Sequence, residues 1–490
     1  MHPDTARLRA RLAEIDEQFI LLQKERTTIQ NTLAALTYPV LTLPAEITSE
    51  IFAQCIVREG GPRHPSPAEA PLLLTHVCRT WRDIAVHDSK LWTAFRIRFC
   101  PYGERRGHPY VQTYLERAGT RPLVMDIAYE ESKTSLESLP LPILLQDIIR
   151  RSSQWQEVTL RLPPSTLENF QSKMNFSALE TLTIFTHRGR PLSSPVGAFA
   201  AALKLRVLRL QNYYTSLDMF TLPWSQLTQL RVESLFFEEA FEVLPLALAL
   251  IDCTFDRIDP HGSQSDVFSL APHLHLKCFA AGGNGCHQLL DRLTLPNLSQ
   301  LQVEPIYNAS LSGFLSFLTR SPEISEFLQS PGYWQLRQDD MVALFMAMPK
   351  LAELRFRVQS PTHINTILRN LRDSPSFLPC VQTISLEIPL CEGYNLGDIE
   401  SNVLSEALSA RWSSASDTAT LWDFSLVWVE GEYGDYGDED ELEIALKEME
   451  INIEKLLLDE QLLKLKDISK DYLAHLTSGQ YELATRNSDT

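Results

Sequence analysis

The first 36 residues carry apolar side chains at alternating intervals of four and three. The series consists of Leu8, Leu12, Ile15, Phe19, Leu22, Arg26, Ile29, Leu33 and Leu36. Arg26 alone interrupts the apolar character of this seam. Heptad spacing of this kind predicts a long helix over residues 1–38. Two arrangements remain open: the helix packs on its own chain, or it self-associates as a coiled coil through residues 8–36.

A second pattern, at residues 41–55, is a short amphipathic helix that begins at a proline. The sequence there reads LTLPAEITSEIFAQC. Pro44 suits a first helical turn because its φ angle is fixed and it lacks an N–H group. Ile47, Ile51 and Cys55 follow at intervals of four, with Phe52 beside them. A stripe this short cannot close a core by itself, so we expect another element or another chain to cover it.

Two more helices are predicted before residue 99. A segment rich in Gly and Pro at 58–71 separates the first helix from LLLTHVCRTWRDIAVH, and HDSKLWTAF then offers Asp88 or Ser89 as a helix cap. The apolar positions of these two helices are Leu74, Val77, Cys78, Trp81, Ile84 and Ala85, followed by Leu91, Trp92 and Phe95. Residues 39–99 are therefore expected to form a small three-helix domain with apolar surface to spare.

Residues 100–395 repeat one motif, in which an apolar residue and a gap of two precede an alternating L-x-L strand. The reference positions are Val158, Leu179, Leu205, Leu227, Leu274, Leu298, Leu351 and Val381, with weaker copies at Leu246 and Ile324. Their intervals of 19 to 30 residues match an irregular leucine-rich repeat. Amphipathic stretches such as LSGFLSFLTR between the strands predict helices on the convex side. We therefore expect an α/β chain with a curved solenoid, although a compact domain rich in βαβ units is the alternative.

The last region, residues 396–490, combines an apolar stretch, TLWDFSLVWV, with an acidic segment and a final amphipathic helix. Between Glu430 and Glu460 there are thirteen acidic residues and two lysines, which accounts for most of the net charge of −18. The helix around 442–456 is expected to cap the end of the solenoid, because terminal repeats need covering. The remaining charge is balanced, so no nucleic-acid partner is expected.

Composition limits the cellular compartments in which the protein is expected. The N-terminus lacks the apolar core of a secretion signal, and the longest apolar run, VLPLALALI, is too short to cross a bilayer. The eight cysteines form no CxxC pair, which fits a reducing compartment. We expect a cytoplasmic or nuclear protein that has no membrane partner.

No arrangement of residues that performs chemistry stands out. The glycine-rich AAGGNGCH at 280–287 lacks the Lys-Ser/Thr of a phosphate-binding loop. Cys278, Cys286 and His287 have the wrong spacing for a metal site and no fourth ligand nearby. No catalytic residues, metal or cofactor are therefore predicted, and the chain is expected not to be an enzyme.

The region around the proline-initiated helix resembles an F-box. The resemblance lies in Leu43-Pro44, Glu46-Ile47, Ile51-Phe52, Val77-Cys78-Arg79, Trp81-Arg82, Ile84-Ala85 and Leu91-Trp92. A heptad helix ahead of it and leucine-rich repeats behind it are similar to the F-box proteins abundant in mushroom-forming fungi. The segment 58–71 is longer than the usual F-box spacing.

The resemblance implies three helices that bind a Skp-type adaptor of a cullin-based ubiquitin ligase, with an unknown client protein on the repeats. The expected adaptor-binding residues are Leu43, Pro44, Ile47, Ile51, Phe52, Leu74, Val77, Cys78, Trp81, Leu91 and Trp92. Arg206, Arg209, Arg355 and Arg357, at exposed strand positions, are the candidate client contacts; the alternative, favoured for any single one of them, is an ordinary solvated strand residue. The alternative is a scaffold that self-associates through its N-terminal helix and forms no ligase.

Overall fold

The structure of the protein is a computed structural model, and its contacts divide the chain into two units. One unit comprises Met1–Leu136 with Pro142–Gln156, and the other comprises Glu137–Leu141 with Glu157–Thr490. The described residues are 3–35, 43–56, 61–99, 108–129, 143–162, 164–167, 170, 174–185, 192, 194–211, 216–260, 270–304, 311–329, 336–358, 360–390, 399–412, 421 and 423–430. The protein is α/β, with a long N-terminal helix followed by parallel strands that alternate with helices.

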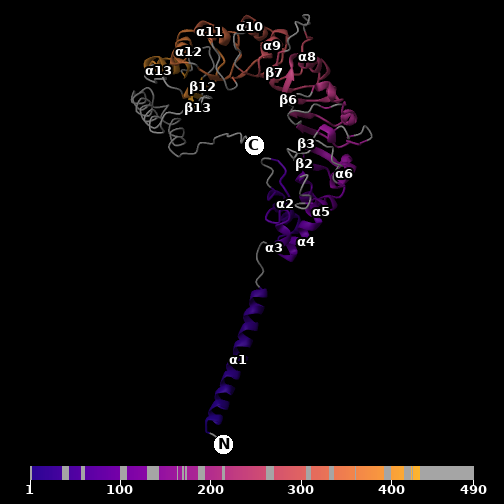
Figure 1. Cartoon of the computed structure of the whole chain (residues 1–490). Coiled ribbons are helices and arrows are strands. Elements are labelled where there is room, and N and C mark those ends of the chain that lie inside the picture. The colour runs from indigo at the N-terminus through magenta and orange to yellow at the C-terminus, as the bar shows by residue number, and fades with distance from the viewer. Residues whose placement is uncertain are drawn as a thin grey trace. The chain divides into compact units, whose positions relative to one another are not determined.

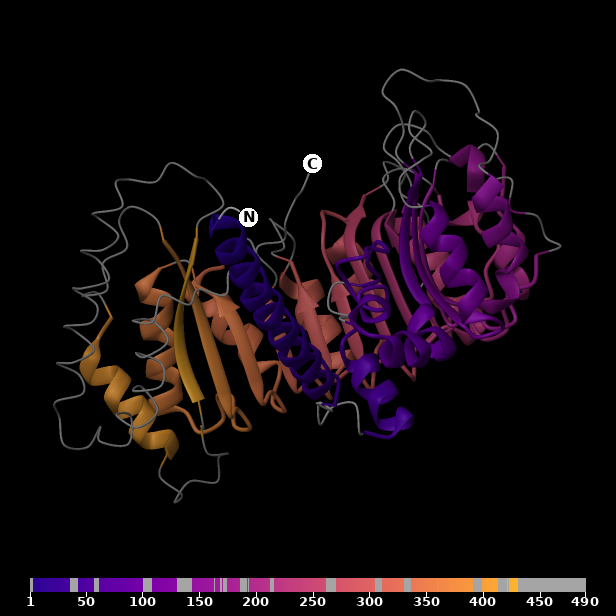
Figure 2. The same cartoon turned by 90° about the horizontal axis from the view of Figure 1, so that it is seen from below.

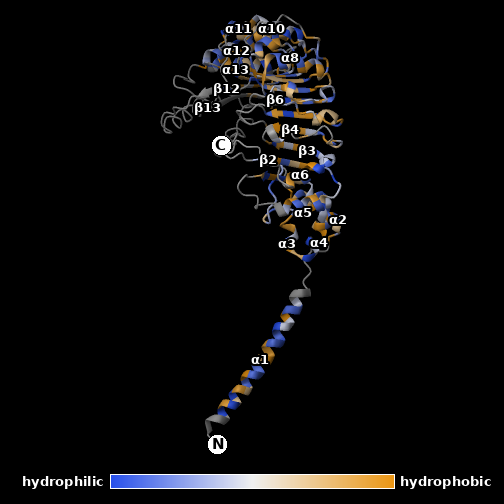
Figure 3. Cartoon of the chain, turned by 45° about the vertical axis from the view of Figure 1, so that its right-hand side comes forward, coloured by the Kyte–Doolittle hydropathy of each residue, from blue (hydrophilic) through white to orange (hydrophobic). Residues whose placement is uncertain are grey.

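Helix α1 (Pro3–Ala35) confirms the long helix predicted from the heptad spacing. Every side chain described on it, from Arg7 to Thr32, is exposed to solvent. Apolar and polar residues alternate along its length (Figure 3). The other predicted regions, residues 39–99, 100–395 and 396–490, remain predictions as separate domains.

After α1, the first unit contains short helices and two parallel strands. The helices are α2 (Ala45–Gln54), α3 (Leu74–Val77), α4 (Arg79–His87), the 3₁₀ helix η2 (Ser89–Trp92), α5 (His108–Ala118), α6 (Ile143–Arg150) and η3 (Ser152–Gln154). Strands β1 (Ala94–Phe99) and β2 (Leu123–Tyr129) pair in parallel, and Arg96 on β1 forms an ion pair of 2.8 Å with the buried Asp126 on β2. This unit therefore joins a helical part to the start of a sheet.

The second and third predicted helices differ from expectation in two places. The second helix is broken at Cys78, whose backbone is extended, with φ −153° and ψ 171°. The Cys78 Sγ accepts a hydrogen bond from the backbone N–H of Trp81, so this residue caps α4. Phe95 lies on β1 and not on the third helix, because η2 ends at Trp92. The predicted cap at Asp88 is confirmed by its hydrogen bond from the Lys90 N–H.

The second unit is built from neighbouring parallel strands with helices on one side (Figures 1 and 2). The strands are β3 (Trp155–Arg161), β4 (Thr181–Phe185), β5 (Val207–Gln211), β6 (Gln229–Phe236), β7 (Asp252–Asp259), β8 (Cys278–Ala281), β9 (Gln300–Val303), β10 (Glu326–Gln329), β11 (Glu353–Arg357), β12 (Thr383–Leu390) and β13 (Asp423–Glu430). Between them lie α7 (Pro164–Leu167), η4 (Ala198–Ala201), η5 (Leu217–Met219), η6 (Trp224–Gln226), α8 (Phe237–Leu246), α9 (Cys286–Arg292), α10 (Leu311–Arg320), α11 (Gln338–Met346), α12 (Pro361–Asp373) and α13 (Ser401–Trp412).

Strand pairing defines the register of the repeat. Two residues before each strand's first paired position lies one buried apolar residue, and these residues are Leu179, Leu205, Leu227, Leu250, Leu276, Leu298, Ile324, Leu351, Val381 and Leu421. Each of them is buried at the same position relative to its strand. Repetition thus gives the second unit a continuous apolar core.

Three of the ten predicted reference positions are wrong by two to four residues. Leu274 and Leu246 are exposed, while Leu276 and Leu250 occupy the buried positions in their place. Val158 pairs in register with Leu182 and is therefore not the counterpart of Leu179. Alternating leucines in LALAL and LHLK offered two possible registers, and only pairing with the neighbouring strands distinguishes them.

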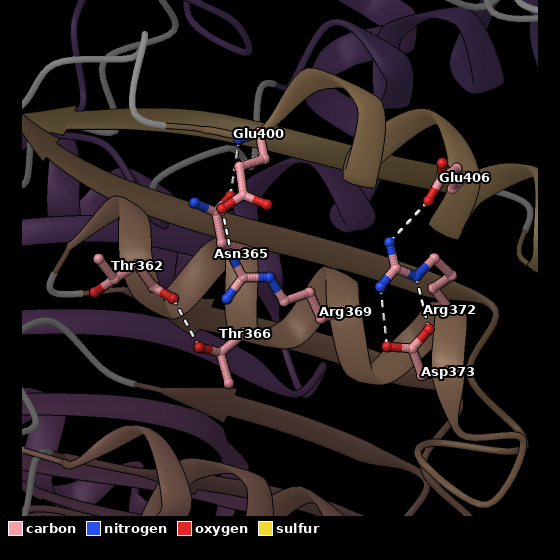
Figure 4. Close-up of polar contacts among 8 residues, drawn as sticks. All are labelled: Thr362, Asn365, Thr366, Arg369, Arg372, Asp373, Glu400 and Glu406. Carbon is pink, nitrogen blue, oxygen red and sulfur yellow. Dashed lines mark hydrogen bonds and ion pairs between the residues drawn. The ribbon is translucent and has the colours of Figure 1, made fainter.

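Helices α12 and α13 pack together and are joined by polar contacts (Figure 4). Arg369 forms an ion pair with Glu400, and Arg372 Nη1 lies 2.7 Å from a carboxylate oxygen of Glu406. The Asn365 side-chain oxygen accepts a hydrogen bond of 3.0 Å from the Glu400 N–H. These polar contacts join α13 to α12 at the surface.

The buried Arg411 on α13 closes the C-terminal end of α12. Its guanidinium donates to the carbonyl oxygens of Leu371, Ser374 and Phe377, at 2.9, 3.0 and 2.6 Å. Desolvation by burial lowers the pKa of Arg411. Because the last carbonyls of a helix have no partner within it, this arginine satisfies groups that would otherwise be buried without hydrogen bonds.

Within the described part of the chain, no helix combines the length and apolar character needed to cross a membrane. Helix α10 confirms the amphipathic helix predicted at LSGFLSFLTR, and β13 forms from the predicted apolar stretch. The predicted acidic helix around 442–456 lies outside the described residues.

Candidate functional site

Helix α2 begins at Ala45, and Pro44, predicted for the first turn, is instead the N-cap residue just before it. Pro44 has φ −53° and ψ 146°, and its carbonyl oxygen accepts hydrogen bonds from both the N–H and the hydroxyl of Thr48, at 3.0 and 3.2 Å. Glu46 lies in the first turn, where a negative charge interacts favourably with the helix dipole. Proline thus sets the direction in which the helix starts, and with it the direction of its two faces.

The two faces of α2 have different surroundings. Thr48 and Phe52 are buried, with Phe52 only 1% exposed. Leu43, Ile47 and Ile51 are exposed, by 51% for Ile47 and 44% for Ile51. Residues four apart lie above one another on a helix, so Ile47 and Ile51 form a line, and the exposed Leu43 precedes the helix next to the extended Pro44. We call these three residues the α2 ridge.

Short helix α3 also leaves apolar side chains in solvent. Leu73 and Val77, again four residues apart, are exposed, whereas Leu72 and Leu74 are buried. Arg82 of α4 donates a hydrogen bond of 2.7 Å to the Thr75 carbonyl and so holds α3 against α4. Exposed branched apolar residues therefore occur on both of the first two short helices.

The two tryptophans of the helical part, Trp81 and Trp92, make different contacts. Trp81 packs edge to face on Phe52, with ring centroids 5.0 Å apart, and is partly buried. Among the described residues, its buried Nε1 atom has no hydrogen-bond partner. Trp92 is fully buried, and its Nε1–H donates to the Ala85 carbonyl at 2.7 Å. Trp92 is thus part of the core of the first unit.

The region around Trp92 is reinforced from α5. Tyr114 packs edge to face on Trp92 at 5.0 Å, and the guanidinium carbon of Arg117 lies 4.2 Å from the centre of the Trp92 ring. Desolvation raises the pKa of the Tyr114 hydroxyl above its usual range, so this group is neutral at physiological pH. The Ser49 hydroxyl on α2 donates to the Asp88 carboxylate, which ties α2 to the start of η2.

The eleven predicted adaptor-binding residues therefore fall into three groups. Leu43, Pro44, Ile47, Ile51 and Val77 are exposed. Cys78 and Trp81 are partly buried. Phe52, Leu74, Leu91 and Trp92 are buried in the core of the first unit. Only the first group presents its side chains fully to another molecule, and the buried group holds the helices that carry it. Leu73 was missed, although its spacing of four from Val77 could have indicated it.

Residues 61–72, in the segment between α2 and α3, contact the first strand. The Arg96 N–H on β1 donates a hydrogen bond of 2.8 Å to the Arg63 carbonyl, and Pro71 and Leu72 are buried before α3 starts. Burial and the nearby Arg98 and Arg96 lower the pKa of His64. A backbone hydrogen bond therefore links the described part of this segment to β1.

The glycine-rich segment has a structural role at the end of β7 and β8. A Cβ on Gly282 would lie 2.4 Å from the Asp256 carbonyl oxygen, and one on Gly283 would lie 2.6 Å from the Ile258 backbone. Gly283 also has a φ of +82°, which favours glycine. Its N–H donates to the Glu304 carboxylate at 2.8 Å. Close backbone approach thus accounts for these glycines.

The two cysteines considered as metal ligands, Cys278 and Cys286, are free thiols. Cys286 is buried, and desolvation raises its pKa to about 12. Desolvation also raises the pKa of the partly buried Cys278. Within the described ranges, no group of three or more His, Cys, Asp and Glu side chains is placed to hold a metal ion.

The candidate client contacts on the strands are not equivalent. Arg209 and Arg355 are exposed. Arg357 is buried and lies 3.4 Å from Glu387, and Arg206 donates to the carbonyl oxygens of Leu203 and Leu205. Arg209 is in register with Arg231, which forms a bidentate pair with Asp256 at 2.8 and 3.0 Å. Three of the four candidates, Arg206, Arg209 and Arg355, are therefore exposed, and Arg206 is the one that also donates to nearby backbone carbonyls.

Comparisons with known proteins give no family assignment. No protein-family model matches the chain, and no curated protein matches it. One of the solved structures that match is a crystal structure of a Bacteroides fragilis protein determined by a structural genomics consortium. It shares 12% identity and a TM-score of 0.33, and the match covers 57% of this chain and 76% of the other.

Proposed function

We propose that this chain is an F-box substrate receptor of a Skp–cullin–F-box ubiquitin ligase. In this proposal the α2 ridge, with Val77, binds an apolar groove of a Skp-type adaptor, and leucine-rich repeats in the second unit hold a client protein. The observation that carries the proposal is the exposure of Ile47 and Ile51 on a helix whose other face is buried. Exposed apolar residues rimmed by polar ones are typical of protein interaction sites.

Several residues of the F-box-like motif make contacts that hold its short helices in place. The Leu-Pro pair immediately precedes α2, Cys78 caps α4, and Trp92 anchors η2 to α4 through the Ala85 carbonyl. Residues of the motif thus either build the helical part or remain exposed on it. An interface of standard size buries about 1,600 Å² in total, and a few aliphatic or aromatic anchors supply most of its binding energy.

The proposed mechanism is positional. A client bound to the repeats would be held close to a ubiquitin-charged enzyme carried by the adaptor and cullin, so its effective concentration there would rise. No chemical step is assigned to this chain. The exposed Arg209 and Arg355 are the positions where a client carboxylate would find an accessible guanidinium.

Binding to a recombinant Skp-type adaptor tests the proposal. The double variant Ile47→Asp with Ile51→Asp places two charges on the α2 ridge. Two anchors worth about 2 kcal/mol each would weaken adaptor binding about a thousandfold, measured by calorimetry or pull-down. Phe52 is left unchanged because it is buried, and its loss would damage the fold.

The matched control is Leu246→Asp with Leu248→Asp, two comparably exposed apolar residues in the second unit. This variant should bind the adaptor like the wild-type chain. If the ridge variant retains wild-type affinity, or if the wild-type chain binds no adaptor, the proposal is wrong.

The second candidate function is a scaffold without a ligase, and the exposed seam of α1 favours it. Affinity purification from cells separates the two functions. Recovery of adaptor and cullin with the full chain supports the ligase, whereas recovery of further copies of this chain alone supports the scaffold.

A further inference from the structure

The apolar seam of α1 is accessible along its whole described length. Leu8, Leu12, Ile15, Phe19, Leu22 and Ile29 are each between 47% and 68% exposed. Four of these six residues are leucine or phenylalanine, and water contacts all of them. A seam of this length has the spacing that two supercoiled helices bury between them.

The seam is the one continuous apolar line on this helix. Ile20 and Leu21 are exposed as well, but the positions three and four residues away are polar. They are Asp16, Glu17, Gln23 and Lys24 around Ile20, and Glu17, Gln18, Lys24 and Glu25 around Leu21. By contrast, the seam meets one polar residue, Arg26, between Leu8 and Leu36. A partner that covers this face must therefore be long, straight and apolar at the same spacing.

We propose that two copies of the chain pair through α1 as a parallel two-stranded coiled coil. A second copy supplies a surface of the required length and spacing. This inference does not depend on the proposed function, because it concerns a helix outside the adaptor-binding residues. If both hold, each assembly carries two adaptor-binding ridges.

Charged residues beside the seam favour the parallel direction. With Leu12, Phe19, Arg26 and Leu33 at heptad position a, Arg11 lies at position g and Asp16 at the following position e. In a parallel pair, Arg11 of one copy faces Asp16 of the other, and this contact occurs twice. An antiparallel pair of the same overlap would bring Arg11 to Thr32 and Asp16 to Gln23, without opposite charges.

Both side chains are free to make that contact from an exposed position. Arg11 and Asp16 are exposed, and Arg11 lies 2.7 Å from Glu14 on its own helix, where both groups are more than half exposed. An exposed pair of this kind contributes little energy, so exchanging it for a contact across the seam costs little.

Arg26 also fits the parallel arrangement. Parallel pairing confines the two copies of Arg26 to a single layer, with Glu25 of the other copy beside each guanidinium. An antiparallel pair would place Arg26 opposite Ile15 and so interrupt two apolar layers. One polar residue at position a is known to define register and number of helices, at a cost in stability.

Light scattering on the full chain tests self-association. The wild-type chain at tens of micromolar should have twice the monomer mass of 55.7 kDa. Leu22→Asp should halve the measured mass, while Ile20→Asp should leave it doubled. These two residues are 62% and 64% exposed and lie on the same helical turn, so they differ only in whether they belong to the seam. A wild-type monomer, or equal effects of the two variants, would overturn the proposal.

Cross-linking tests the direction. In a parallel pair, Leu12→Cys places two thiols in one layer, and mild oxidation should link the copies. In an antiparallel pair Leu12 would face Ile29, which places the two thiols about 26 Å apart at 1.5 Å per residue. Ala10→Cys, which points away from the seam, is the matched control and should not link. A doubled mass of the Leu12→Cys variant without a cross-link would overturn the parallel assignment.

Discussion

Helices α2 and α12 both have a proline at their start and lie in opposite surroundings. Pro44 is the N-cap of α2 and Pro361 is the first residue of α12, and each helix carries branched apolar residues at helical spacing. In α12, Ile364, Ile367, Leu368 and Leu371 are all buried. In α2, both isoleucines are exposed. An amphipathic stripe therefore indicates that a surface can be covered, but not that its own chain covers it.

The difference comes from what each helix packs against. Helix α12 contacts both α11 and α13, and Arg411 of α13 closes its C-terminal end. Helix α2 contacts α4 and η2, which cover only the side that carries Thr48 and Phe52. Regular repetition supplies a neighbour for each helix in the second unit, whereas α2 comes before the repeats begin.

The sharpest test of this comparison removes the same atoms from both helices. Ile367→Ala should destabilise the protein by about 2–5 kcal/mol, because it leaves a cavity in a packed core. Ile51→Ala should cost less than about 1 kcal/mol, because its side chain is already in contact with water. Urea unfolding of the full chain, followed by circular dichroism, measures both changes. Equal losses of stability would mean that α2 is covered after all.

A smaller effect is expected from losing the hydrogen bonds of Arg411 at the C-terminal end of α12. Arg411→Ala leaves the carbonyls of Leu371, Ser374 and Phe377 without the guanidinium that pairs with them. The free energy of unfolding should fall by about 1–3 kcal/mol in total, because water can reach the part-buried Ser374 carbonyl once the side chain is removed. Arg411→Lys should recover part of the stability, because an ammonium group can still reach some of the carbonyls. If Arg411→Ala unfolds at the wild-type urea concentration, the cap contributes nothing.

The smallest effect is expected at the surface between α12 and α13. Arg372→Ala removes the contacts with Glu406 and Asp373, and it should not change the unfolding midpoint measurably, because exposed ion pairs are screened by water. Arg372 lowers the pKa of Asp373, so any contribution is present at neutral pH and lost as acid protonates that carboxylate. A clear loss of stability at pH 7 would show that ion pairs, and not apolar packing, hold α13 in place.

Much of the fold could be predicted from periodicity. The spacing of four and three identified α1, and the L-x-L pattern identified most strands between β4 and β12. The errors at Leu246 and Leu274 arose where leucines alternate for longer than one strand needs. Both registers satisfy local alternation there, and only the neighbouring strands determine which leucine is buried.

The candidate site was predicted less completely. Pro44 and the apolar spacing of Ile47 and Ile51 indicated the helix and its ridge, but nothing local separates Ile51 from its neighbour Phe52. Phe52 is buried because Trp81, 29 positions later, packs on its ring. The break at Cys78 was also missed, because a cysteine sulfur that caps a helix has no strong sequence signal.

Sequence alone therefore determined the long N-terminal helix and most of the repeating strands, since helical and strand periodicity are properties of neighbouring residues, whereas β1 and β2 were not predicted. The tertiary structure decided which apolar residues are covered. Burial depends on residues far apart in the chain, such as Arg411 at the end of α12 or Trp81 beneath α2. For this reason the α2 ridge and the α1 seam, similar in sequence to core stripes, could be recognised as surfaces only once their surroundings were known.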